Sequence, residues 1–180
     1  SCHDKDGKAN INMYLTVKPR DLTLSLLNEI ETYKIIKDGA HFWGAKSSLM
    51  PSFKTLYYDE ELRAVAYYVH NVFNKNLKQR IDVLLKESEK EPVAQDKKML
   101  KWGKKIFNRN CKYCHGKEGK GDGIATKNPV DSIFPYDLTK TLLSKKKIFL
   151  YIKYGGKHFG SYNKDMPSWK RKYNDFKIHS

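Results

Sequence analysis

Apolar side chains recur at helical spacing in two long stretches of the chain. One row predicts an amphipathic helix and consists of Leu62, Val65, Ala66, Val69, Val72 and Phe73. The other predicts a helix within residues 98–110 and consists of Met99, Trp102, Ile106 and Phe107. Shorter helices are expected at about residues 143–154 and between Ile81 and Leu85, ahead of Pro92. Asp59 is the expected N-cap of the first of these helices.

A C-x-x-C-H motif follows the second apolar row, at Cys111-Lys112-Tyr113-Cys114-His115. This pattern is the attachment signature of c-type haem. Two cysteines at this spacing form thioethers to the vinyl groups on one edge of the porphyrin, and the adjacent histidine supplies a ligand to the iron. A C-x-x-C pair also occurs in thioredoxin-like and zinc sites. The βαβ pattern of the former is absent, and no further zinc ligands lie at short spacing.

The sequence after the motif resembles the class I cytochrome c domain. The resemblance includes a loop with glycines at 116, 119, 121 and 123, the segment Pro135-Tyr136-Asp137-Leu138-Thr139, and Asp165-Met166-Pro167. It implies an all-α fold, His115 as the proximal iron ligand and Met166 as the distal one. Taken alone, Met166 also suits a core position. His41 and His158 are alternative distal ligands.

An internal repeat relates the two halves of the chain. A shift of 116 residues aligns residues 19–59 with residues 135–175 without a gap. Identical pairs include Pro19 with Pro135 and Met50 with Met166. The first half therefore resembles a second cytochrome c domain.

The repeat assigns a matching haem site to the first half. Cys2-His3 aligns with Cys114-His115 when the following loop is taken as four residues shorter, which makes Ser1 the last variable position of a C-x-x-C-H motif. His3 and Met50 are then the axial ligands, and Cys2 is a thioether cysteine. A chance Cys-His pair is the alternative. The motif's following glycine is replaced by Asp4.

We therefore expect two tandem cytochrome c-like helical domains. They comprise a first unit (1–74) and a second unit (98–180), joined by a partly helical connector (75–97). By the repeat, the opening helix of the first unit and the closing helix of the second are expected to be missing at the two chain ends.

Composition narrows the class of protein. The chain has 39% hydrophobic and 31% charged residues, and 35 Lys and Arg against 20 Asp and Glu give a charge of +15. Lysines occur along the whole length without a nucleic-acid-binding motif, so we expect no nucleic acid and favour redox protein partners with acidic docking surfaces. No run of eighteen apolar residues is present, so membrane association is expected only through segments outside this sequence. Haem attachment predicts a periplasmic or otherwise exported location.

Two haem c groups with His/Met ligation leave no open coordination position and suit outer-sphere electron transfer. The implied function is a dihaem electron carrier of the cytochrome c4 type, or a dihaem subunit of a respiratory complex. Two alternatives remain: a dihaem redox enzyme of the peroxidase or thiosulfate dehydrogenase type, and a fixed relay subunit in a larger assembly.

Overall fold

The computed structural model describes residues 2–10, 18–45, 49–86, 96–127, 135–161 and 166–179. Within these ranges the regular structure is helical and contains no strand, which confirms the all-α prediction. The α-helices are α1 (Glu29–Asp38), α2 (Asp59–Tyr68), α3 (Leu77–Lys86), α4 (Lys97–Ile106), α5 (Lys112–His115), α6 (Lys145–Tyr154) and α7 (Asp175–His179). The shorter 3-10 and π-helical segments are η1 (Leu22–Leu24), η2 (Val69–Phe73), η3 (Phe107–Cys111), η4 (Ile124–Lys127), η5 (Leu138–Lys140) and η6 (Gly156–Phe159).

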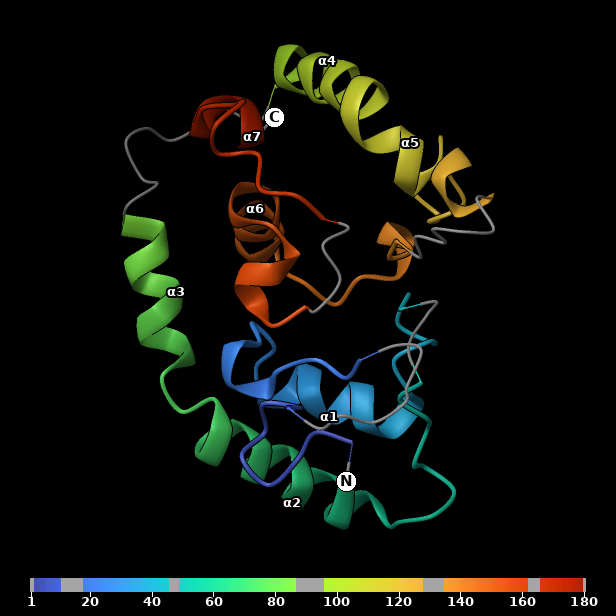
Figure 1. Cartoon of the computed structure of the whole chain (residues 1–180), viewed down its shortest axis with the longest axis vertical. Helices are drawn as coiled ribbons and strands as arrows, with labels where there is room; N and C mark the ends of the chain where they lie inside the picture. Colours follow the sequence, from blue (N-terminus) through green and yellow to red (C-terminus); the bar gives the residue numbers. More distant parts are fainter. Residues whose placement is uncertain are drawn as a thin grey trace.

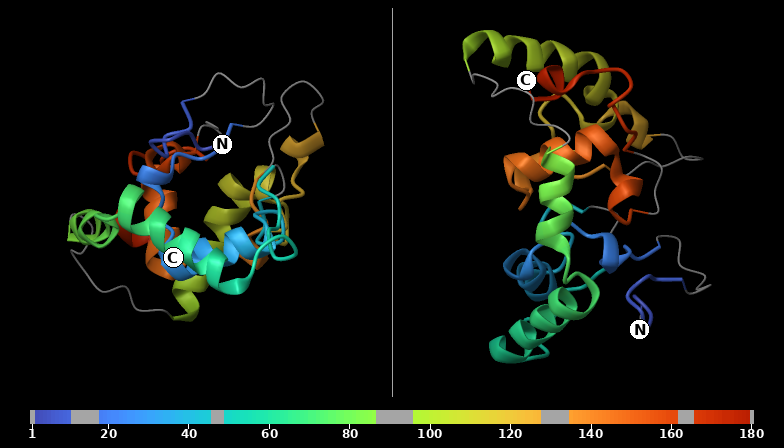
Figure 2. Two further views of the ribbon diagram at one scale, coloured as in Figure 1. Left: turned by 90° about the horizontal axis from the view of Figure 1, so that it is seen from below. Right: turned by 90° about the vertical axis from the view of Figure 1, so that its left-hand side faces the viewer.

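The helices are distributed along one long axis. Helices α4 and α7 lie together at one end, α1 and α2 lie at the other, and α3 runs alongside between them (Figures 1 and 2). None of the described helices is long and apolar enough to cross a membrane.

Helices α1 and α6 occupy equivalent places in the repeat and have equivalent ends. Helix α1 is capped by Asn28, whose side chain accepts the Glu31 N–H, and α6 is capped by Ser144. Each ends at a glycine of positive φ, 83° at Gly39 and 81° at Gly155, a conformation that costs least for a residue without Cβ. The N-cap of α2 is Tyr58, so the prediction that Asp59 is the cap is wrong by one residue.

Hydrogen bonds recur at the offset of the sequence repeat. The Phe53 N–H donates to Ile36 at 3.2 Å, and the Trp169 N–H donates to Ile152 at 3.1 Å. The Ser52 hydroxyl donates to the Lys37 carbonyl and the Ser168 hydroxyl to the Lys153 carbonyl, both at 2.7 Å. The two units thus share local geometry as well as sequence in the stretch that ends on Met50-Pro51-Ser52 and Met166-Pro167-Ser168.

The larger buried cluster extends across the predicted boundaries. It contains Leu26 of the first unit, two leucines of α3, and residues of α6, η6 and α7; its members are Leu26, Leu77, Leu85, Phe149, Leu150, Phe159 and Ile178. A smaller cluster of Ile36, Leu62 and Ala66 joins α1 to α2. The segment predicted as a connector therefore packs on the second unit and contributes to its core.

At the junction between the units the same hydrogen bond occurs twice, once with each unit as the donor. The Asp21 N–H donates to the Gly160 carbonyl at 3.0 Å, and the Asp137 N–H donates to the Gly44 carbonyl at 2.9 Å. These residues correspond in the repeat, so the exchange has the reciprocity of a local twofold axis. Glu31 and Lys147, which also correspond, form a largely buried ion pair of 2.5 Å. Reciprocal contacts hold the two units in one arrangement.

Candidate functional site

Cys111, Cys114 and His115 lie together on the segment that continues from α4. Cys111 ends the π-helical segment η3, and Cys114 and His115 belong to α5. None of the three cysteines forms a disulfide with another. Burial, with a smaller effect of Cys114, raises the pKa of the Cys111 thiol, which keeps this sulfur protonated at neutral pH. Two cysteines three positions apart on adjoining helical segments have the spacing that covalent haem attachment uses.

The His115 ring is oriented by a main-chain hydrogen bond. Its Nδ1 lies 3.2 Å from the Tyr136 carbonyl oxygen. Because a carbonyl only accepts, Nδ1 carries the proton and Nε2 presents its lone pair. Burial lowers the pKa of His115, which favours the neutral ring. A neutral imidazole fixed through Nδ1 is the form in which histidine ligates iron.

The loop after the motif folds back closely onto it. The Gly121 N–H donates to the His115 carbonyl at 2.8 Å, and the Gly123 N–H donates to the Cys114 carbonyl at 3.1 Å. A Cβ at Gly123 would collide with the Tyr113 and Cys114 carbonyl groups. The glycine-rich loop predicted from the sequence thus allows close backbone packing against the Cys-His segment.

Met166 comes from a separate segment, between η6 and α7. It directly follows residues 162–165, which lie outside the described ranges, and its side chain is partly buried. Its carbonyl accepts the Gly156 N–H at 2.9 Å. The Ser168 hydroxyl bond to Lys153 holds the other side of the turn on α6. Met166 therefore sits on a loop anchored to the end of α6.

The first unit repeats the arrangement around the histidine. His3 Nδ1 lies 2.9 Å from the carbonyl oxygen of Arg20, the residue that aligns with Tyr136. Burial lowers the pKa of His3, as it does that of His115. Cys2 is exposed.

The shortened loop of the first unit also keeps the geometry of the second. The Ala9 N–H donates to the His3 carbonyl at 3.1 Å, as Gly121 does to His115. Asp4 has φ of 63°, close to the 79° of Gly116, its counterpart in the second unit. Aspartate is among the few residues with a side chain that adopt this region. Asp4 therefore keeps the left-handed backbone of the glycine that it replaces.

The surroundings of Met50 are compatible with two roles, packing in the first unit and ligation of iron. Its carbonyl accepts the Ala40 N–H at 3.2 Å, as that of Met166 accepts Gly156. Its side chain is partly buried and packs against the cluster of Ile36, Leu62 and Ala66. The predicted iron ligand is thus also a packing residue of the first unit.

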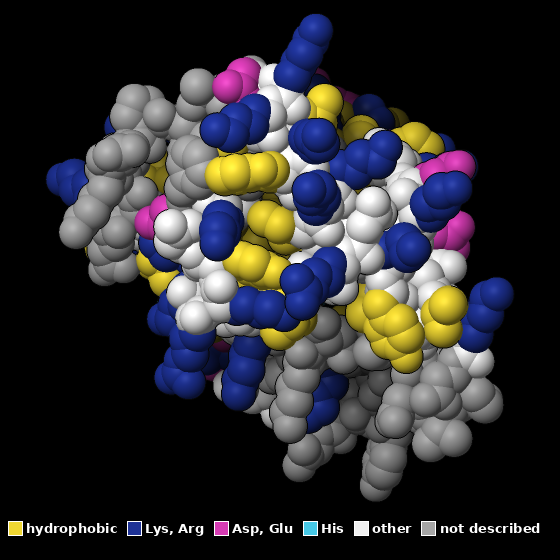
Figure 3. Space-filling model, turned by 90° about the horizontal axis from the view of Figure 1, so that it is seen from above, with side chains coloured by type: hydrophobic (Ala, Val, Ile, Leu, Met, Phe, Trp, Pro, Cys, Tyr) yellow, Lys and Arg dark blue, Asp and Glu magenta, His cyan; other side chains and the backbone are white. Residues whose placement is uncertain are grey.

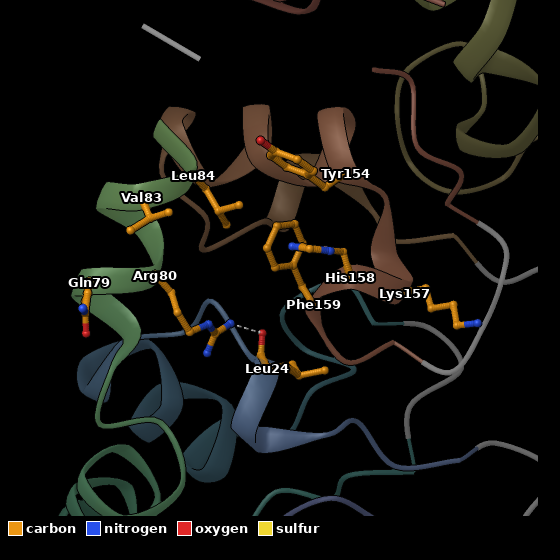
Figure 4. A pocket seen from close by; sticks show the side chains of 9 residues that line it. All are labelled: Leu24, Gln79, Arg80, Val83, Leu84, Tyr154, Lys157, His158 and Phe159. Carbon is orange, nitrogen blue, oxygen red and sulfur yellow. Dashed lines mark hydrogen bonds between the residues drawn. The ribbon is translucent and has the colours of Figure 1, made fainter. Parts of the chain in front are cut away.

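The remaining histidines differ in environment. His41 is exposed. His158 is exposed, and its ring centre lies 5.1 Å from that of Tyr154 in a stacked arrangement. It also lines a hollow of about 750 Å³ between α3 and η6 (Figure 4). His70 is half-buried on the π-helical segment η2, and its Nδ1 has no hydrogen-bond partner among the described residues. It is thus more enclosed than a surface histidine.

Arg20 is a site residue that sequence reasoning missed. Its carbonyl binds His3, while its guanidinium donates to the Tyr151 hydroxyl at 2.5 Å. The guanidinium carbon also lies 6.0 Å from the Tyr136 ring centre, and the Tyr136 carbonyl binds His115. No carboxylate of the described residues forms an ion pair with Arg20. One residue therefore contacts the neighbourhood of both histidines, and nothing in the repeat signals it, because its counterpart is tyrosine.

Comparison with known proteins identifies the class. Residues 99–178, slightly under half of the chain, match the family described as cytochrome C oxidase, cbb3-type, subunit III. The match supports a c-type cytochrome domain in this part of the chain, with covalently bound haem c, and it supports electron transfer by a haem protein as the class of function.

A similar solved structure is a chain of the Kuenenia stuttgartiensis reducing HAO-like protein complex. It shares 23% identity with a TM-score of 0.48, over 99% of this chain and 86% of that chain. No curated protein matches the chain.

Proposed function

We propose that the chain is a dihaem electron carrier or electron-transfer subunit, with one haem c in each unit. In the second unit Cys111 and Cys114 hold the haem, and His115 and Met166 are the axial ligands. In the first unit Cys2 is one thioether cysteine, and His3 and Met50 are the ligands. When bound, each haem supplies one-electron iron chemistry. Export to the periplasm and exchange with redox protein partners are part of this proposal.

The main support for a haem in the first unit is a histidine hydrogen bond that both units share. His3 and His115 each place Nδ1 against the carbonyl of the residue after an aligned proline, at 2.9 and 3.2 Å. A structural histidine has no need for the same tautomer, the same acceptor and the same following turn as a haem ligand. The bond fixes each ring and holds the Nδ1 proton, so that Nε2 is the ligating nitrogen in both units.

The relative position of the two units supports transfer between the haems. The guanidinium of Arg20 links the peptide that binds His3 to Tyr136 and Tyr151 of the second unit. The reciprocal bonds of Asp21 and Asp137 fix this arrangement. A fixed separation suits outer-sphere transfer, because no domain motion is needed between electron arrival and departure.

Haem stoichiometry tests the proposal. A pyridine haemochrome assay on the full-length exported protein should give two haems per chain. His3→Ala and His115→Ala should each alter the spectrum and potential of a different haem, with the other unchanged. The matched control is His41→Ala, an exposed histidine that should alter neither.

Two outcomes would contradict the proposal. One haem per chain, unaffected by His3→Ala, would remove the site in the first unit. Rapid carbon monoxide binding by the reduced wild-type protein would reveal an open coordination position and favour the enzyme alternative.

A further inference from the structure

The positive charge of the protein belongs almost entirely to the second unit. Residues 1–74 contain nine Lys and Arg and nine Asp and Glu, whereas residues 98–180 contain twenty and six. Lysines do occur along the whole chain, but only in the second unit are they left without a comparable number of acidic residues. The two units lie toward opposite ends of the long axis, so the molecule is electrically polar along that axis (Figure 1).

Nine of the twenty Lys and Arg residues of the second unit, together with Lys97 of the connector, lie toward one end of the molecule. These exposed side chains form a surface that we call the basic face, which consists of Lys97, Lys98, Lys101, Lys104, Lys105, Arg109, Lys112, Lys170, Arg171 and Lys172. Two hydrogen bonds join its two parts: Asn110 donates to the Tyr173 hydroxyl at 2.8 Å, and Lys172 donates to the Asn110 side chain at 2.9 Å. Figure 3 looks onto this end, where Lys and Arg side chains surround small apolar areas and acidic side chains lie toward the margins.

The charge of the basic face is not used within the chain. The ion pairs of the described residues engage Lys37, Arg63, Lys120, Lys147 and Lys153, none of which belongs to the face. Lys98, Lys170 and Lys172 lie over aromatic rings, and Lys172 also donates to Asn110, so these neighbours are uncharged. A set of exposed like charges without carboxylate partners repels itself. An external anionic surface would relieve that repulsion.

The basic face continues into the haem-attachment segment. Lys112 lies between the two cysteines, and Arg109 precedes Cys111 in η3. Large apolar side chains are exposed among the cations, with Leu100 at 72% and Tyr113 at 62%. Apolar contacts within a charged surface are typical of protein interfaces, in which charge guides the encounter and apolar contact limits dissociation. A partner seated here lies beside the second haem site and away from the first.

We propose that the basic face docks an acidic redox protein, which exchanges electrons with the protein through the second unit. The inference rests on the proposed function, because it needs a haem beside Cys111 and Cys114. It adds a direction: the acidic partner meets the haem of the second unit, and the electrically balanced first unit faces a different partner.

Charge reversal on and off the basic face tests this. The probe is an oxidised, acidic copper protein of the plastocyanin class, mixed with the fully reduced haem-loaded protein in a stopped-flow instrument. One electron passes to each probe molecule; the haem iron is oxidised and copper(II) becomes copper(I). At low ionic strength, Lys101→Glu with Lys105→Glu should lower the second-order rate constant about tenfold. The control pair, Lys54→Glu with Lys78→Glu, makes the same change in net charge off the face and should lower it less than about twofold.

Other outcomes would overturn the proposal. Equal loss in both pairs would mean that net charge acts without a docking face. If the Lys101/Lys105 pair left the rate unchanged but abolished binding to phosphatidylcholine vesicles containing phosphatidylserine, the face would be a membrane surface. Haem content is measured on every sample, so that one haem per chain refutes the proposed function, whereas two haems with a rate independent of the face refute this inference alone.

Discussion

Arg20 joins the two candidate haem sites through its main chain and its side chain. The carbonyl fixes His3, and the guanidinium reaches Tyr151 and the face of Tyr136. The hydroxyl of Tyr151 is a neutral partner, because burial raises its pKa. A half-buried cation paired only with a neutral hydroxyl keeps most of its field. That field disfavours the more positive, oxidised state of any iron nearby.

Removal of the Arg20 charge should lower the reduction potentials of the haem-loaded protein. Arg20→Gln should shift at least one potential downward by on the order of tens of millivolts, as loss of a nearby cation stabilises the oxidised iron. Spectroelectrochemical titration measures both potentials. Arg20→Lys is the matched control, because it keeps the positive charge and loses only the planar donor. Its reduction potentials should stay close to those of the wild type. Unchanged potentials in Arg20→Gln would show that the guanidinium acts only in packing.

At the scale of elements, helices α2 and α7 begin alike. Asp59 opens α2 and binds Lys37 of α1 at 2.7 Å, and Asp175 opens α7 and binds Lys153 of α6 at 3.0 Å. Asp59 also accepts from Tyr33 and from Arg63. These donors, with Lys37 the strongest, hold the pKa of the Asp59 carboxyl well below its usual range. The contact joins the start of one helix to the end of another in both units.

Asp59→Asn should therefore destabilise the protein in a pH-dependent manner. Because the pKa is depressed in the folded state, the carboxylate stabilises above the unfolded pKa, about 3.9. The melting temperature of the haem-loaded variant should be below that of wild type at pH 7, and the difference should shrink as the pH falls below about 4. Glu60→Gln removes a charge from the same helical turn without an ion pair and should have a smaller effect. A difference independent of pH would contradict this role.

Helix positions followed from the sequence better than helix surroundings did. The stretch predicted at residues 98–110 forms α4 and η3, and the one at 143–154 contains α6. Apolar spacing marks the face that is buried but not what covers it, so Leu77 and Leu85 of α3 gave no sign that they pack on the second unit. Lys147 belongs to a run of three lysines in the sequence, yet it is buried against Glu31. That partner lies 116 residues away, beyond the reach of local pattern.

The same contrast holds for the candidate site: its ligands could be predicted from the sequence, and the contacts around them could not. Motif and repeat indicated Cys111, His115, His3 and the two methionines, because covalent chemistry and a 116-residue offset are both recorded in the sequence. The hydrogen bonds that fix the histidines join residues 17 and 21 positions apart. Contacts between the units, including those of Arg20, depend on how two folded surfaces meet.

At the scale of the whole molecule, two glycines allow the backbones of the two units to come into contact. Gly44 has φ of 95°, and a Cβ there would lie 2.6 Å from the Asp137 carbonyl oxygen. Gly160 has φ of 78°, and its Cβ would collide with the Asp21 carbonyl oxygen in the same manner. Each glycine carbonyl accepts the N–H of the aspartate that it faces. The backbones of the two units therefore touch at two related points, which a side chain would separate.

Gly160→Ala should weaken the junction beyond its local backbone strain. Gly119 supplies the control, because its φ of 74° is similar while the nearest atom to its Cβ, in Leu138, would be 3.6 Å away. Gly119→Ala incurs only the cost of a left-handed conformation, about 1 kcal/mol. Gly160→Ala adds the collision with Asp21 and loss of the reciprocal bond, so its free energy of unfolding should fall by about 2 to 4 kcal/mol. Guanidinium denaturation of both haem-loaded variants, followed by circular dichroism, measures the difference. Equal losses would mean that the units do not depend on this contact, whereas a larger loss in Gly160→Ala would make the junction a source of stability as well as of a fixed separation between the two units.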